Sequence, residues 1–157
     1  MPSPASTPLD GGCNCGKVRF RLEVAPIITH CCHCKDCQKA SGSAFCINAM
    51  IEAEHLTVLA GTPQRFQGAD SPDVARCADC GVVLWSHHPH FGTAIAFVGV
   101  GRLDHGERLA PEAHYFTRSK HPWVQLPPGL PAFEALGFPQ KPEAEARIGA
   151  VMAKQQS

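Results

Sequence analysis

Alternating hydrophobic and polar positions predict the first strand of the chain, over residues 17–24. Val18, Phe20, Leu22 and Val24 alternate with charged residues, and this period of two is typical of a strand with one buried face. Shorter apolar segments bounded by turn residues predict further strands over 44–51, 56–59, 64–67, 74–76, 82–85 and 94–100. Together these segments indicate a mainly β protein in which most neighbouring strands run antiparallel.

Helical signals are scarce. Residues 36–41 could form about one helical turn that stops at Gly42, and residues 142–154 predict a terminal helix with proline first and glutamates in its first turn. Prolines, glycines and scattered aromatic residues between 122 and 142 indicate an extended strap. We therefore expect a disordered tail over residues 1–9, one folded domain over 10–137, and a helical C-terminal extension over 138–157.

Composition narrows the class of protein. The chain has 157 residues, 44% of them hydrophobic and 18% charged, which suits a single domain with a buried core rather than a disordered chain. Its 14 glycines and 14 prolines favour short strands joined by turns. The formal net charge is zero and basic residues form no long run, so nothing indicates a nucleic-acid partner.

Neither export nor membrane insertion is indicated. Residues 1–8 lack the apolar stretch of a secretory signal, and the longest apolar segment, 93–101, is too short to cross a membrane. A cytoplasmic location is the resulting expectation. In that compartment nine cysteines are better explained as metal ligands or reactive thiols than as a disulfide framework.

Two cysteine pairs predict a closed metal site. Cys77 and Cys80 have the spacing of a zinc knuckle, and Cys13 and Cys15 are bracketed by glycines that permit a sharp bend. Four thiolates at about 2.3 Å saturate a tetrahedral zinc, so this site is interpreted as structural. A redox role for Cys77 and Cys80 is the alternative, although the alternating strands and helices of thioredoxin-like proteins are missing.

A second cluster, Cys32, Cys34 and Cys37, predicts an open metal site. Three sulfurs this close can reach one ion and leave a fourth position for substrate, as catalytic zinc requires. Three thiolates also blunt the acidity of a zinc-bound water, which favours sulfur chemistry over amide hydrolysis. Alternatively, Cys31 or His33 closes the site as a fourth ligand, or Cys32 and Cys34 oxidise to a disulfide when metal is lost.

Other candidate residues have simpler interpretations. Cys46 lies in an apolar strand pattern and is interpreted as a small buried hydrophobe. His33 stands between two predicted ligands and is expected to point away from them. His87, His88 and His90 follow Trp85 and are candidates for catalysis, but loop histidines usually face water.

These motifs resemble, in order and spacing, those of the glutathione-dependent formaldehyde-activating enzyme family, also called GFA or centromere-protein-V-like domains. The matching segments are 11–20, 32–42 and 77–81, followed by 119–124 and 129–131. The resemblance covers about residues 10–137, and three cysteine motifs in fixed order make it specific. The departures are the Cys31-Cys32 doublet and Cys46.

The resemblance implies a mainly β, Mss4-like fold with zinc-bound antiparallel sheets. It implies one structural zinc on Cys13, Cys15, Cys77 and Cys80, and a more labile catalytic zinc on Cys32, Cys34 and Cys37. The implied activity is a carbon–sulfur lyase equilibrium between glutathione plus formaldehyde and S-(hydroxymethyl)glutathione. The implied partners are thus a small-molecule thiol and an aldehyde, with no nucleic acid and no membrane, and a homodimer is left open.

Glutathione carries two carboxylates, so cationic side chains near the second cluster would help to bind it. Lys35 and Lys39 are the predicted contacts, with Arg118 and Lys120 as further candidates, and each is equally well explained as a solvated surface residue. The rival functions are a zinc-stabilised glutathione carrier and a protein-interaction module without catalysis. An accessible second cluster in a basic groove favours ligand handling, whereas a broad exposed apolar patch favours an interaction module.

Overall fold

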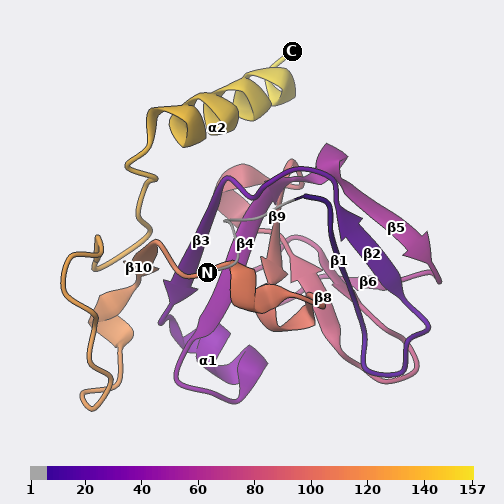
Figure 1. The fold of residues 1–157 in the computed structure, drawn as a ribbon, viewed down its shortest axis with the longest axis horizontal. Helices are drawn as coiled ribbons and strands as arrows, with labels where there is room; N and C mark the ends of the chain where they lie inside the picture. The colour runs from indigo at the N-terminus through magenta and orange to yellow at the C-terminus, as the bar shows by residue number, and fades with distance from the viewer. Residues whose placement is uncertain (1–6) are drawn as a thin grey trace.

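Two β-sheets form the body of the protein in the computed structural model, which describes residues 7–157 (Figure 1). The smaller sheet has the order β1-β2-β5, with β1 Leu9–Gly12, β2 Arg19–Leu22 and β5 Leu56–Ala60. The larger has the order β10-β3-β4-β9-β8-β7-β6. Its strands are β3 Ile28–Cys32, β4 Cys46–Glu52, β6 Gln64–Phe66, β7 Val74–Arg76, β8 Val83–Ser86, β9 Ile95–Gly99 and β10 Ala113–Tyr115.

Within residues 7–157, helix is confined to short segments and to the C-terminal end. The α-helices are α1 Lys35–Ser41 and α2 Pro142–Gln155, and the 3-10 turns are η1 Ala53–His55, η2 Pro89–Phe91, η3 Val100–Arg102, η4 Gly106–Arg108 and η5 Thr117–Ser119. Every strand pairing is antiparallel except that of β10 with β3. The predicted fold class, mainly β with antiparallel sheets, short helical turns and a C-terminal helix, is confirmed.

The core is divided by the large sheet into two clusters. Along β4, Ala49 and Ile51 belong to one cluster and Met50 to the other, as expected where successive side chains alternate between faces. The small sheet packs on the first cluster, in which Phe20 meets Trp85 edge to face with ring centroids 5.6 Å apart. Residues of the strap and of α2 pack on the second cluster.

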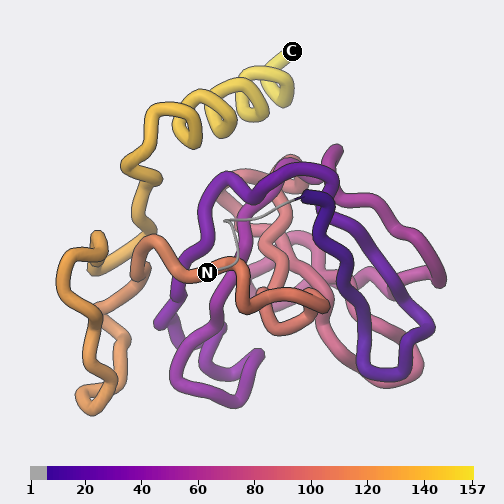
Figure 2. The backbone as a smooth tube through the Cα atoms, in the orientation of Figure 1, coloured from indigo at the N-terminus to yellow at the C-terminus, as the bar shows by residue number. Residues whose placement is uncertain are grey.

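The strap extends from the end of η5 to α2 without a further helix or named strand, in agreement with the extended segment predicted between 122 and 142 (Figure 2). It lies along β10: the His114 N–H donates to the Pro131 carbonyl at 2.9 Å, and the Phe133 N–H donates to the His114 carbonyl at 2.9 Å. Of the predicted tail, residues 1–6 lie outside the described residues. The predicted tail also included Leu9, but Leu9 begins β1 and is buried at 2% exposure in the first core cluster, so that prediction is wrong for this residue.

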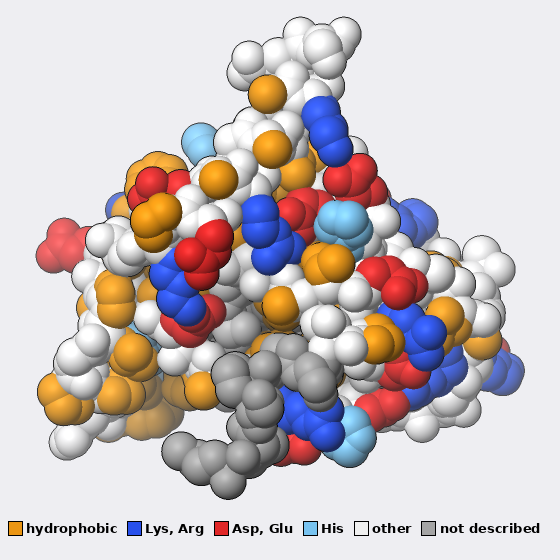
Figure 3. All heavy atoms as spheres, turned by 45° about the horizontal axis from the view of Figure 1, so that its top comes forward, with side chains coloured by type: hydrophobic (Ala, Val, Ile, Leu, Met, Phe, Trp, Pro, Cys, Tyr) orange, Lys and Arg blue, Asp and Glu red, His pale blue; other side chains and the backbone are white. Residues whose placement is uncertain are grey.

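Charged side chains of both signs are interspersed on the face shown in Figure 3. This mixed surface agrees with the zero formal net charge. In the part of the chain that the structure describes, no helix is long and apolar enough to cross a membrane.

Helix α2 is held against the body of the protein by one partly buried ion pair. Arg147 donates to both carboxylate oxygens of Glu52, with Nε to Oε1 at 2.7 Å and Nη2 to Oε2 at 2.6 Å, and to the Ala25 carbonyl at 2.9 Å. Ala144 and Val151 of α2 are buried in the second core cluster. The predicted strand over 44–51 stops one residue short of Glu52, whereas β4 includes Glu52, whose side chain is 6% exposed and pairs with Arg147.

We expect Arg147→Ala to lower the free energy of unfolding by about 2–3 kcal/mol, measured by urea denaturation, because it leaves the buried Glu52 carboxylate unpaired. Lys154→Ala is the matched control: Lys154 lies on the same helix as Arg147 and pairs with Glu54 of η1, but both side chains are more than half exposed. Its expected effect is within about 0.5 kcal/mol. Equal effects of the two substitutions would contradict the proposed importance of the Glu52 pair.

Candidate metal centres

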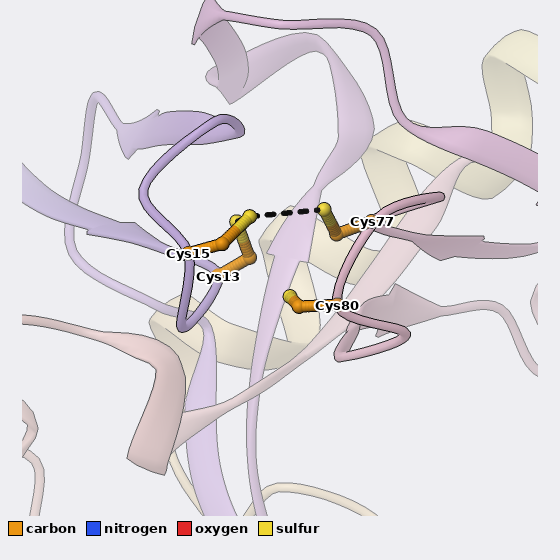
Figure 4. Close-up of side chains that lie close together, drawn as sticks. All are labelled: Cys13, Cys15, Cys77 and Cys80. Carbon is orange, nitrogen blue, oxygen red and sulfur yellow. Dashed lines mark hydrogen bonds between the residues drawn. The ribbon is translucent and has the colours of Figure 1, made fainter.

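Four cysteines from two distant turns converge on one point. Cys13 and Cys15 lie in the turn between β1 and β2, and Cys77 and Cys80 lie in the turn between β7 and β8 (Figure 4). All four sulfurs lie within 4.8 Å of one another, with Cys13 Sγ 3.5 Å from Cys15 Sγ and Cys15 Sγ 3.6 Å from Cys77 Sγ. Sulfurs at the corners of a zinc tetrahedron with 2.3 Å bonds are about 3.8 Å apart, so the group fits a four-thiolate metal site.

Each turn is built in the same way. The first cysteine donates its N–H to a carbonyl five residues later, Cys13 to Val18 at 3.1 Å and Cys77 to Val82 at 3.0 Å. Gly16 and Gly81 take positive φ angles of 79° and 77°, a conformation that a side chain would strain. The Val18 N–H also donates to Cys13 Sγ at 3.3 Å, and this hydrogen bond is the main cause that lowers the pKa of Cys13 to about 6.

The four-sulfur arrangement favours a metal site over a redox role for Cys77 and Cys80. A dithiol pair needs only Cys77 and Cys80, so it leaves the approach of Cys13 and Cys15 unexplained, whereas a shared metal ion accounts for all four positions. Lys17 and Asp79, one from each turn, also form an ion pair at 3.0 Å. The donor set and its geometry therefore favour a metal ion that joins the small sheet to the large one.

A second group of three sulfurs lies where β3 meets α1. Cys32 ends β3, Cys34 precedes α1, and Cys37 lies in the first turn of the helix. Their sulfurs are all within 4.8 Å of one another. The Cys37 N–H donates to Cys34 Sγ at 3.3 Å, so this sulfur takes the place of the usual oxygen acceptor at the start of a helix. Hydrogen bonds from the Cys32 and Cys37 thiols lower the pKa of Cys34.

Backbone contacts fix the orientation of α1 and hence of this group. The Gln38 side chain donates from Nε2 to the His33 carbonyl at 2.9 Å and to the Ser119 carbonyl at 3.0 Å. Gly42 ends the helix in the left-handed conformation at φ 63° and returns its N–H to the Gln38 carbonyl. The predicted helix over 36–41 thus begins one residue earlier and stops where expected.

The alternative fourth ligands, Cys31 and His33, lie outside the three-sulfur group. Cys31 points to the opposite face of the sheet from Cys32, is 3% exposed, and has its pKa raised to about 11 by burial. His33 was expected to point away from the ligands, and it is fully buried with Nε2 3.0 Å from His114 Nδ1. Neither residue replaces Cys32 in this arrangement.

Cys46 is the residue near this group that sequence reasoning misinterpreted. It is half-buried rather than enclosed in the core, it pairs with Cys32 in the β3–β4 register, and its Sγ donates to the Cys37 carbonyl at 3.1 Å. The antiparallel pairing of the strands on either side of α1 is what places Cys46 beside Cys32. A local hydrophobic pattern does not contain that pairing, so the sequence did not indicate this position for Cys46.

The three histidines after Trp85 occupy different environments. His87 is buried with Nδ1 2.7 Å from the Ile95 carbonyl, and burial is the main cause that lowers its pKa. His88 is half-buried beside Phe97, with ring centroids 6.1 Å apart, and His90 is exposed. The expectation that these loop histidines face water is therefore wrong for His87, whose ring connects the loop to β9.

The predicted glutathione contacts Lys35 and Lys39 are exposed on α1, the helix that carries Cys37. Lys35 Nζ donates to Gln38 Oε1 at 3.3 Å. Arg118 is also exposed, whereas Lys120 donates to the carbonyls of His121 at 3.1 Å and Val124 at 2.7 Å. The first three cations are thus available to a ligand, and their role in binding glutathione stays a prediction.

Comparison with known proteins relates the chain to one family. The family described as "GFA: Glutathione-dependent formaldehyde-activating enzyme" matches residues 8–119. A Halomonas elongata protein with the provisional name glutathione-dependent formaldehyde-activating enzyme is 28% identical over 152 residues, covering 90% of this chain and 96% of the relative. The crystal structure of a Rhodobacter sphaeroides protein aligns with a TM-score of 0.48 and 16% identity, covering 79% of this chain and 98% of that one.

We expect protein purified without chelator to contain two bound metal ions, and Cys80→Ser to lose one of them and to unfold at a lower temperature. Cys80 is exposed, so its replacement leaves the core packing intact, and the loss of stability would come from the loss of metal. Mass spectrometry of the native protein and calorimetric melting measure the two effects. The control, Cys31→Ala, should keep both ions; unchanged metal content in Cys80→Ser would contradict the four-sulfur site.

Proposed function

This chain belongs to the glutathione-dependent formaldehyde-activating enzyme family, and on that premise we propose that it is a zinc-dependent carbon–sulfur lyase. Its substrates are adducts of glutathione with a small aldehyde, formed and broken down in a reversible reaction such as that of S-(hydroxymethyl)glutathione. The four-sulfur group of Cys13, Cys15, Cys77 and Cys80 holds a structural zinc. The three-sulfur group of Cys32, Cys34 and Cys37 holds the catalytic zinc.

The observation that carries this proposal is the convergence of three thiols, and not four, within 4.8 Å of one another at the start of α1. Tetrahedral zinc with three protein ligands keeps one position for a substrate atom. When bound, zinc supplies positive charge that favours the thiolate form of a substrate thiol. A soft donor set of three thiolates suits a sulfur substrate better than a water nucleophile.

The chain's own residues hold the three-sulfur group in position. Gln38 fixes α1 between the His33 and Ser119 carbonyls, so the sulfurs present a fixed face to the substrate. In the forward direction the glutathione sulfur bonds to the aldehyde carbon, and the thiol proton passes to the aldehyde oxygen. Holding the two reactants together contributes most of the acceleration, because a thiolate adds readily to an unhindered aldehyde.

A cytoplasmic location accompanies this proposal. None of the nine cysteines is in a disulfide, and both metal groups need their thiols reduced. A reducing compartment supplies that condition together with the thiol substrate.

Calorimetric titration of the zinc-loaded protein with glutathione tests the proposal directly. We expect saturable binding to the wild type, and no binding to Cys32→Ser, which should keep one zinc and its fold because the four-sulfur group is intact. Cys31→Ala is the matched control, since Cys31 precedes Cys32 but faces the other side of the sheet. No binding to the two-zinc protein would remove the thiol-substrate hypothesis, and binding without turnover of formaldehyde would leave a glutathione carrier.

A second prediction concerns the cations on α1. Lys35→Ala and Lys39→Ala should each weaken glutathione binding about two- to fivefold, as expected for an exposed ion pair worth up to ~1 kcal/mol. The effect should shrink as salt is raised from about 0.05 to 0.5 M, because exposed charges are screened. Lys154→Ala on α2 is the control cation, and equal affinity in all three variants would remove Lys35 and Lys39 from the site.

A further inference from the structure

Cys46 stands beside the three-sulfur group but is not one of its three sulfurs. The β3–β4 register pairs it with Cys32, and directly opposite residues of antiparallel strands have Cβ atoms about 4.5–5.5 Å apart, on the same face of the sheet. From the other side, α1 brings the Cys37 carbonyl to 3.1 Å from Cys46 Sγ. Two of the three predicted ligands are thus immediate neighbours of Cys46.

The surroundings of Cys46 are those of a thiol with access to the site rather than of a core residue. Cys46 is half-buried and begins β4, whereas Ala49 and Met50 further along the strand are buried at 0% and 2% exposure. Cys31, the cysteine of β3 that faces the opposite side of the sheet, is 3% exposed. Cys46 is therefore less enclosed than Cys31, and it lies on the same face of the sheet as Cys32.

We propose that Cys46 is a displaceable fourth metal ligand, which closes the three-sulfur site while no substrate is bound. The three sulfurs of Cys32, Cys34 and Cys37 converge on one point, and a fourth thiol completes the tetrahedral set that zinc prefers. Cys46 lies outside the group whose sulfurs are all within 4.8 Å. The proposal therefore requires a change of the Cys46 side-chain rotamer that turns its sulfur toward the group.

The proposal deepens, and rests on, the proposed function of the same site. With a metal ion bound, a substrate thiol would take the place of the Cys46 sulfur, and the proton of that thiol would pass to Cys46. One thiolate replaces another, so the net charge of the site is conserved and nothing is oxidised or reduced. A protein thiol in this position protects the metal from loss between turnovers, while an entering thiol exchanges for it at little free-energy cost.

The test uses cobalt(II)-substituted protein, whose sulfur-to-metal charge-transfer absorption grows with the number of thiolate ligands. We expect Cys46→Ser to lose the absorption of one thiolate and to bind zinc at the second site at least about tenfold more weakly in chelator competition. Cys31→Ala should match the wild type in both measurements. Cys46→Ser keeps a hydroxyl that can donate to the Cys37 carbonyl, and Cys46→Ala removes it.

Glutathione then separates this proposal from the function on which it rests. Added glutathione should leave the absorption of the wild type unchanged, because one thiolate replaces another, and should raise that of Cys46→Ser by one thiolate. Wild-type absorption and zinc affinity in Cys46→Ser would overturn the fourth-ligand proposal, whether or not Cys46→Ala is altered. A loss of one thiolate in Cys46→Ser with no response of either protein to glutathione would support the ligand and refute the thiol-substrate function.

Discussion

The mutual approach of four sulfurs from two turns is the constraint on which the arrangement of the two sheets depends. The turn between β1 and β2 belongs to the small sheet, and the turn between β7 and β8 belongs to the large one. Cys13 and Cys77 also belong to the core cluster on which the small sheet packs and in which Phe20 meets Trp85. A metal ion on this group would contribute its binding free energy directly to folding.

The segment from β3 through α1 to β4 also brings cysteine sulfurs together, but it gathers three of them rather than four. Cys32 is placed by a strand, Cys34 by a helix start and Cys37 by the first helical turn, so three sulfurs from six consecutive residues converge. The sulfur of Cys34 accepts the Cys37 N–H, which ties the formation of the helix to the placement of the group. The antiparallel return of β4 then adds Cys46 beside Cys32.

Sequence patterns predicted the features that depend on residues close together in the chain. Cysteine spacing identified both sulfur groups, and period-two alternation located β2, because its two faces differ in burial. The same reasoning missed β3, which is buried at every position and so has no alternation, and the short strands β1 and β10. The environments of His33 and Cys46 depend on pairing with His114 and Cys32, and no local pattern encodes which strands become neighbours.

The two sulfur groups differ most in the rigidity of the elements that carry them. Cys13 and Cys77 are buried at 9% and 1% exposure in the core cluster between the sheets, so opening that group would disturb the core. Helix α1 has only seven residues and none of them is buried. Elements with few buried contacts are those that open at low free-energy cost. The four-sulfur and three-sulfur groups therefore differ less in their donor atoms than in how firmly the fold holds the backbone that carries each group.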